Sequence, residues 1–173
     1  MGPARPARKD AARNRERLLT AARALFAEQG HDVPLDDVAR AAEVSRATLY
    51  RHFASREELA ATIYAAGIAR VEQRAAALAG DPDGARKLFA YVLDLQRRTR
   101  TIVPVLSRAD TDGFADLARR TAAAFRPLVT AGKQAGAIHP AVGLTDVLLA
   151  IQMAETAPPR AHAILLRGLF TGA

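Results

Sequence analysis

Residues 44–53, VSRATLYRHF, combine the pattern of a short buried helix with an unusual exposed face. In a helix that begins after Ser45, Leu49 and Phe53 lie four residues apart on one side, where both can be buried. Surface helices usually carry Glu, Lys or Gln on the side that faces water. Here that side consists of arginine, tyrosine and a small residue, namely Arg46, Ala47, Tyr50 and Arg51.

Two helices are predicted before this stretch. Apolar residues at three- and four-residue steps indicate a first helix from about Ala11, with Gly30 in position to cap its C-terminus. Pro34 can open a second, short helix over about 35–42. A tight turn at residues 42–44, AEV, then leads into the helix that the Ser45 hydroxyl can cap.

A fourth helix is predicted directly after the VSRATLYRHF stretch. Ser55 followed by Glu58 has the spacing of a capping box, and the helix should reach about Leu78. Two short helices joined by a turn of three or four residues, with a third helix before them, are the layout of a helix-turn-helix unit. An ordinary small helical bundle with the same turns is the alternative.

Two longer segments carry a family resemblance. Residues 15–30, RERLLTAARALFAEQG, and 33–64, VPLDDVARAAEVSRATLYRHFASREELAATIY, resemble the N-terminal domain of TetR-family transcriptional regulators. The resemblance implies a homodimeric, all-helical DNA-binding repressor whose larger C-terminal domain binds a small-molecule inducer.

Two positions depart from the family pattern. Glu43 occupies the turn position that is usually glycine, and a left-handed residue other than glycine costs roughly 1–2 kcal/mol. The turn must therefore adjust or tolerate strain. Pro34 replaces a residue that is often threonine and contacts a phosphate, so that one backbone contact is in doubt.

The third helix is expected to enter the DNA major groove by its N-terminal end. Arg46 is the first choice for a base contact, because its planar fork matches O6 and N7 of guanine. By resemblance, Tyr50 reaches a phosphate with its hydroxyl, and Arg56 meets another at the start of the fourth helix. The complete predicted DNA-binding set is Ser45, Arg46, Ala47, Thr48, Tyr50, Arg51, His52 and Arg56.

Several of these residues also have a purely structural interpretation. Tyr50 could pack between helices with its hydroxyl in water, and His52 could be structural or face a phosphate. The basic N-terminal segment could form a solvated arm or follow the DNA backbone or minor groove. Its basic residues are Arg5, Arg8, Lys9, Arg13, Arg15 and Arg17.

The C-terminal part is predicted to be helical throughout. A helix over about 85–100 is apolar around its circumference and should lie at the centre of this domain. A short helix at 101–108, TIVPVLSR, and a longer one over about 110–135 follow. Pro158 and Pro159 separate the last two helices.

By resemblance, the last two helices pair with their copies in a second chain as a four-helix bundle, although they could instead pack only within the monomer. The candidate interface residues are Leu144, Val147, Leu148, Ile151, Ile164, Leu165, Gly168 and Leu169. An inducer should bind among helices four to eight, where each candidate could equally be plain core. The candidates are Phe89, Val92, Gln96, Phe114, Phe125, Gln152 and Met153.

Composition narrows the function further. The absence of cysteine excludes disulfides and cysteine chemistry, and the four histidines lack metal-ligand spacing, so we expect no enzyme, metal or cofactor. No apolar run approaches the ~20 residues of a membrane span, which predicts a protein of the reducing cytoplasm. The 25 Lys and Arg against 18 Asp and Glu, a net charge of +7, favour a polyanionic partner.

The sequence thus predicts an all-α protein with a flexible basic arm (1–10), a helix-turn-helix domain (11–56) and a ligand-binding and dimerisation domain (57–173). Its predicted function is repression from a palindromic operator, relieved by a small-molecule inducer. Two rival hypotheses remain. A partner-binding module with an incidental basic head would have no discrete DNA site, and an architectural DNA binder would show no sequence preference.

Overall fold

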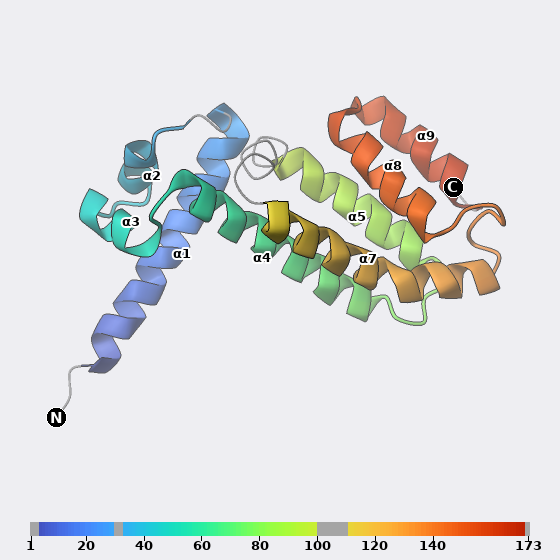
Figure 1. Ribbon diagram of the computed structural model, residues 1–173, viewed down its shortest axis with the longest axis horizontal. Coiled ribbons are helices and arrows are strands. Elements are labelled where there is room, and N and C mark those ends of the chain that lie inside the picture. The colour runs from blue at the N-terminus through green and yellow to red at the C-terminus, as the bar shows by residue number, and fades with distance from the viewer. Residues whose placement is uncertain (1–3, 30–32, 100–110, 172–173) are drawn as a thin grey trace. The chain divides into compact units, whose positions relative to one another are not determined.

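The computed structural model describes residues 4–29, 33–99 and 111–171 (Figure 1). The regular elements in these ranges are helices. In addition, one isolated antiparallel bridge pairs Ile138 with Phe170. The predicted all-α class is confirmed. The described residues divide into two compact units, one ending at Tyr64 and the other beginning at Ala65.

The N-terminal unit consists of four helices around one core. They are α1 (Ala4–Gln29), α2 (Leu35–Ala41), α3 (Arg46–His52) and the first part of α4 (Arg56–Ala77). Helices α1, α2 and α3 all contact one another, as Figure 1 shows. The buried core residues are Leu18, Leu19, Ala22, Phe26, Val33, Val38, Ala39, Ala42, Leu49, Phe53, Leu59, Ala60 and Ile63.

Helix α1 is longer than the sequence pattern suggests. The pattern places its start near Ala11 and treats residues 1–10 as a flexible arm, whereas the helix begins at Ala4. Pro6 is the third residue of the helix, where an N–H group would have no intrahelical acceptor, so proline is tolerated there. The neighbouring alanines and arginines are strong helix formers. Residues 4–10 are therefore helical.

The turn between α2 and α3 is a Schellman motif. The N–H of Glu43 donates to the carbonyl of Arg40, and the N–H of Val44 donates to that of Ala39, both at 3.0 Å. Glu43 takes the left-handed position with φ of 51°, the one positive φ at a described residue other than glycine. Its carboxylate accepts a hydrogen bond from the Arg17 guanidinium of α1. The turn therefore tolerates the strain and is tied to α1.

The C-terminal unit contains the rest of α4 together with α5 (Gly84–Thr99), α7 (Thr111–Gln134), α8 (Leu144–Thr156) and α9 (Pro159–Leu169). The short helix predicted at 101–108 lies outside the described residues.

Helix α5 contacts both α8 and α9 and supplies the middle of the core. Phe89 of α5 meets Phe170 edge to face, with ring centroids 5.7 Å apart. Unlike the sequence expectation, α5 is not buried all round, since Lys87 and Ala90 are exposed. None of the described helices is both long and apolar enough to cross a membrane.

The strain at Glu43 can be measured separately from its ion pair. In an Arg17→Ala background, Glu43→Gly should raise the free energy of unfolding by about 1 kcal/mol, because glycine reaches a left-handed φ without the Cβ clash. Urea denaturation measures the difference. Glu43→Ala in the same background keeps the clash and is the control. Equal stabilities of the glycine and alanine proteins would show that the turn is unstrained.

Candidate nucleic-acid interface

Helix α3 is held in place at both ends and on one face. The Ser45 hydroxyl accepts a hydrogen bond from the N–H of Thr48 (3.2 Å), which confirms the predicted cap. Leu49 is fully buried, and Phe53, the C-terminal cap residue, is 1% exposed. The guanidinium of Arg15 on α1 lies over the Phe53 ring, 5.3 Å from its centroid. These contacts fix the rotation of α3 about its own axis.

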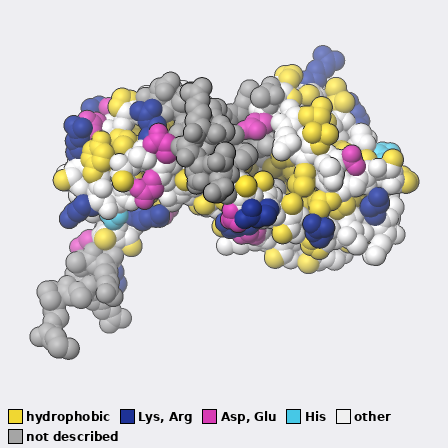
Figure 2. Space-filling model, in the orientation of Figure 1, with side chains coloured by type: hydrophobic (Ala, Val, Ile, Leu, Met, Phe, Trp, Pro, Cys, Tyr) yellow, Lys and Arg dark blue, Asp and Glu magenta, His cyan; other side chains and the backbone are white. Residues whose placement is uncertain are grey.

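The opposite face of α3 is exposed, as the sequence predicts. Arg46, Ala47, Tyr50 and Arg51 all lie on the surface. The guanidinium carbon of Arg46 lies 5.6 Å from the Tyr50 ring centroid, and its Nε is 3.1 Å from Oδ1 of Asp36 on α2. Figure 2 shows basic and acidic side chains next to one another on the visible face of this unit. Asp36 was not among the sequence candidates.

Other candidates on α3 are engaged within the helix. The hydroxyls of Thr48 and Ser45 are hydrogen-bonded at 2.8 Å, and Arg51 donates to Oγ1 of Thr48 at 3.2 Å. The ring of His52 is half buried beside Phe53. These bonds orient Ser45, Thr48 and Arg51 as one polar group at the exposed end of the helix.

The start of α4 has the predicted Ser55 cap. The N–H of Glu58 donates to the Ser55 hydroxyl (3.2 Å), whereas Oε2 of Glu58 accepts from the N–H of Ala54, one residue before the cap (2.7 Å). Hydrogen bonds from its own backbone N–H and from Ser55 hold the pKa of Glu57 below its ordinary value. Because carboxylates occupy this helix terminus, a phosphate here would be bound mainly by the Arg56 side chain.

Part of the basic N-terminal segment has structural partners. Arg15 stacks over Phe53, and Arg17 pairs with Glu43. Both residues therefore stabilise the helix-turn-helix unit. Lys9 and Arg13 are exposed on α1, and the side chains of Arg5 and Arg8 lie outside the described residues.

The predicted ligand residues are divided between the core and the surface. Phe89, Val92 and Phe125 are buried in the core, whereas Gln152 and Met153 are exposed. The Nε2 of Gln96 donates to the Ile151 carbonyl (3.1 Å), and its buried Oε1 has no hydrogen-bond partner among the described residues. The Phe114 side chain lies outside the described residues.

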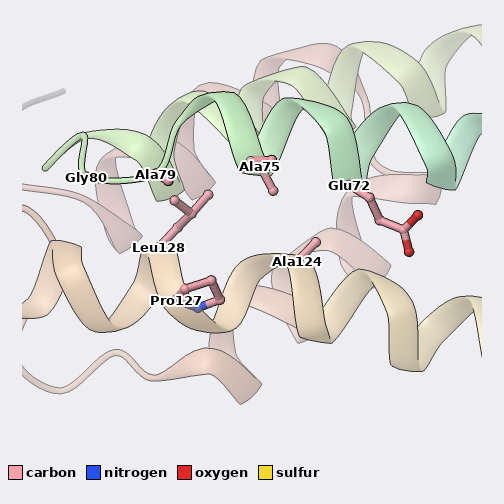
Figure 3. Close-up of a pocket in the computed structure, with 8 residues that line it drawn as sticks. Glu72, Ala75, Ala79, Gly80, Ala124, Pro127 and Leu128 are labelled. Carbon is pink, nitrogen blue, oxygen red and sulfur yellow. The ribbon is translucent and has the colours of Figure 1, made fainter.

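A hollow of about 280 Å³ opens instead between α4 and α7. Figure 3 shows Glu72 and Ala75 of α4, and Ala79 in the turn after α4, on the side of the hollow opposite α7. Arg120 of α7 donates to both carboxylate oxygens of Glu72 (2.8 and 2.7 Å), which lowers the pKa of Glu72. The residues that line the hollow are Glu72, Ala75, Ala76, Ala79, Gly80, Ala124, Pro127 and Leu128.

The predicted dimer residues are divided between core and surface. Val147, Ile151 and Leu169 are buried in the core of their own chain. Leu144, Leu148 and Leu165 pack partly against that core, whereas Ile164 and Gly168 are exposed. Leu149, which is not among the sequence candidates, and Met153, which is a ligand candidate, are exposed and lie four residues apart on α8.

The described residues contain no group of three or more His, Asp or Glu side chains that could hold a metal ion. The exposed face of α3 carries the cations of Arg46 and Arg51 and the hydroxyl of Tyr50, beside carboxylates in the first turns of α2 and α4. The cations and the hydroxyl are groups that suit contact with base edges and phosphates.

Comparisons with known proteins agree with this geometry. Residues 18–63 match the sequence profile of bacterial regulatory proteins of the tetR family. A search of curated proteins found no match.

Solved structures match over nearly the whole chain. A TetR transcription regulatory protein from Mycobacterium vanbaalenii is 26% identical, with a TM-score of 0.73 over 96% of this chain and 100% of that one. The TetR transcriptional regulator SCO0520 from Streptomyces coelicolor is 26% identical, with a TM-score of 0.67 over 92% and 99%.

A more distant structure, a gamma-butyrolactone receptor described as ArpA-like, shares the fold at 19% identity, with a TM-score of 0.65 over 94% and 91%. The tetR-family profile over the helix-turn-helix, together with the likeness of both units to TetR regulators, assigns the family. The chain belongs to the TetR family and is a DNA-binding transcriptional regulator.

Proposed function

We propose that the protein is a homodimeric repressor that binds a palindromic operator through α3 and is released by a small molecule. The observation that carries the proposal is the fixed orientation of α3. Leu49 and Phe53 are buried on one side, and Arg46 and Tyr50 are exposed on the other. A short helix held in this way can enter the major groove by its N-terminal end.

Base and phosphate contacts are divided among different residues. Arg46 is placed to read a guanine, while the Tyr50 hydroxyl and the Arg56 side chain meet phosphates. Phosphate contacts supply affinity and register, and base contacts supply sequence choice. In a dimer, two α3 helices would occupy successive major grooves about 34–36 Å apart.

The dimer is proposed to form through α8 and α9. Leu149, Met153 and Ile164 are each more than half exposed, which is unusual for large apolar side chains. Helices α8 and α9 contact each other within the chain, so the three side chains belong to one helical pair. Pairing with a second copy would remove this apolar surface from water.

The inducer is proposed to bind at the hollow between α4 and α7. Its volume of about 280 Å³ is close to the lower end of the ~300–1,000 Å³ typical of ligand pockets, so a small ligand fits best. Alanine and proline make most of its wall apolar, and Glu72 and Arg120 supply polar groups at one side. A related fold described as a gamma-butyrolactone receptor supports a ligand-binding role for this unit.

Helix α4 connects ligand and DNA in this mechanism. It begins four residues after α3 ends and continues into one wall of the hollow. A ligand can release the operator only by binding the non-binding state more tightly than the DNA-bound state.

Selection of bound fragments from a random duplex library at near-physiological salt tests the proposal. An enriched palindrome would support a dimeric regulator with a specific operator. Enrichment of an unpaired half-site would contradict the dimer, and binding without any enriched sequence would favour an architectural DNA binder. Adding candidate small molecules to the operator complex then tests release.

Arg46→Ala should weaken operator binding by about 1–3 kcal/mol and relax the preference at one base pair. Arg56→Ala is the comparison, because loss of a phosphate contact weakens binding to all sequences and reduces the salt slope by about one. Titrations of the operator and of single-base variants over a range of salt concentrations measure both effects. An equal loss on all sequences for Arg46→Ala would make Arg46 a phosphate contact.

Two substitutions of Ser45 separate folding from DNA binding. Ser45→Ala should lower the free energy of unfolding by about 1 kcal/mol, because the Thr48 N–H loses its acceptor. Ser45→Asp should keep the cap but weaken binding to every duplex, because the added carboxylate repels phosphates. Urea denaturation and DNA titration on both proteins measure this. Unchanged DNA binding by the aspartate protein would place this end of α3 away from phosphates.

Gly168→Ala tests the proposed dimer. A Cβ at this position meets nothing within 4 Å among the described residues, so the monomer should gain about 0.5–1 kcal/mol of stability. If α9 packs closely against its copy, the same methyl group should raise the dimer dissociation constant about tenfold, or 1.4 kcal/mol. Sedimentation over a concentration range measures this.

Gly67→Ala in α4 is the matched control for that experiment, since its Cβ makes only an ordinary contact of 3.6 Å with Leu95. A Gly168→Ala protein that is more stable and dimerises normally would exclude close packing at Gly168.

A further inference from the structure

We infer that Asp36 is a specificity-determining residue, because it directs the Arg46 guanidinium toward a guanine and away from phosphates. The inference rests on the base contact proposed for Arg46. Asp36 belongs to α2 and would itself make no attractive contact with DNA. It would act as a positioning residue through the arginine.

Two contacts from different helices fix the Arg46 side chain. Its Nε lies 3.1 Å from Oδ1 of Asp36 on α2, and its guanidinium carbon lies 5.6 Å from the Tyr50 ring centroid on α3. The contact with Asp36 restrains the Nε side of the guanidinium, and the contact with Tyr50 places the guanidinium over an aromatic ring. A free arginine side chain loses much rotamer freedom on binding, and these two contacts restrict it in advance.

The ion pair with Asp36 also bears on which N–H groups remain for DNA. A guanidinium has five N–H groups on three nitrogens, and Nε is the nitrogen that lies 3.1 Å from the Asp36 carboxylate. The two terminal nitrogens are left to donate to O6 and N7 of one guanine in an end-on contact. Asp36 therefore selects one of the ways in which Arg46 could bind a pair of acceptors.

The charge of Asp36 distinguishes a guanine from a phosphate. A phosphate carries a full negative charge and would be repelled by the carboxylate, whereas the guanine edge is a neutral pair of acceptors. Because the two side chains are 69% and 46% exposed, water weakens their attraction in the free protein. Docked DNA excludes that water and strengthens both the attraction and the repulsion.

The neighbouring residue Asp37 provides a matched control. It follows Asp36 in the first turn of α2 and pairs with Arg40 of the same helix at 3.1 Å. Asp36→Asn and Asp37→Asn remove the same charge from the same helix turn. Only Asp36→Asn releases Arg46.

The experiment compares both variants on three duplexes: the selected operator, the operator with the Arg46-dependent base pair exchanged, and an unrelated sequence. Asp36→Asn should lower the preference for the operator over its exchanged form by about 3–10-fold, since part of the discrimination of a bidentate pair is lost. It should also steepen the salt slope on the unrelated duplex by about one, because Arg46 becomes free to bind a phosphate. Asp37→Asn should retain the wild-type preference.

Three results would overturn the role of Asp36. The two variants could lose preference equally, which would indicate a general charge effect. Asp36→Asn could strengthen operator binding more than unrelated binding, which would mean that Asp36 masks Arg46. The effect of Asp36→Asn could persist in an Arg46→Ala background, which would mean that Asp36 acts independently of Arg46.

Arg46→Ala separates this inference from the proposed function. If Arg46→Ala weakens binding to all three duplexes equally, the proposed base contact is wrong. If Arg46→Ala abolishes the preference at one base pair while Asp36→Asn does not reduce it, the base contact stands and the role of Asp36 is wrong.

Discussion

The burial of Leu49 and Phe53 on one side of α3 is the constraint on which the proposed DNA-binding surface depends. A helix of seven residues is too short to be stable alone in water, so its existence depends on packing. The same packing fixes its rotation, because both apolar side chains must enter the core that α3 shares with α1, α2 and α4. Arg46 and Tyr50 are exposed as a consequence. The stability of the helix and its capacity to meet DNA therefore have one origin.

The Schellman turn adds a second constraint by fixing α2 relative to α3. Asp36 and Arg46 are ten positions apart in sequence and on different helices, so they meet only at the crossing angle that this turn imposes. Glu43 holds the turn in a strained conformation, and Arg17 ties Glu43 to α1. The turn thus connects three helices and supports the contact that we propose directs Arg46.

Structural features that depend on residues close together in the chain can be predicted from the sequence. Features that depend on which side chains become buried in the tertiary structure cannot. The caps at Ser45 and Ser55, and the strained turn, follow from short spacings. In α8, by contrast, residues 147–151 are all apolar, so periodicity cannot distinguish the buried Val147 from the exposed Leu149. The hollow between α4 and α7 arises from missing side-chain volume at alanines and glycine, which leaves no positive signal. The Asp36–Arg46 contact likewise depends on a tertiary angle.

The two kinds of contact in the C-terminal unit explain why the hollow is a suitable place for an inducer to act. Across the hollow, α4 and α7 are joined by the Glu72–Arg120 ion pair, and such partly exposed pairs contribute little to stability. The contacts of α5 with α8 and α9 include buried aromatic side chains such as Phe89, whose truncation to alanine would cost about 3–5 kcal/mol. A tenfold shift between two states needs only about 1.4 kcal/mol of differential binding. A ligand bound in the hollow as we propose would therefore need only about this much preference for one state to shift the arrangement of α4 and α7 tenfold.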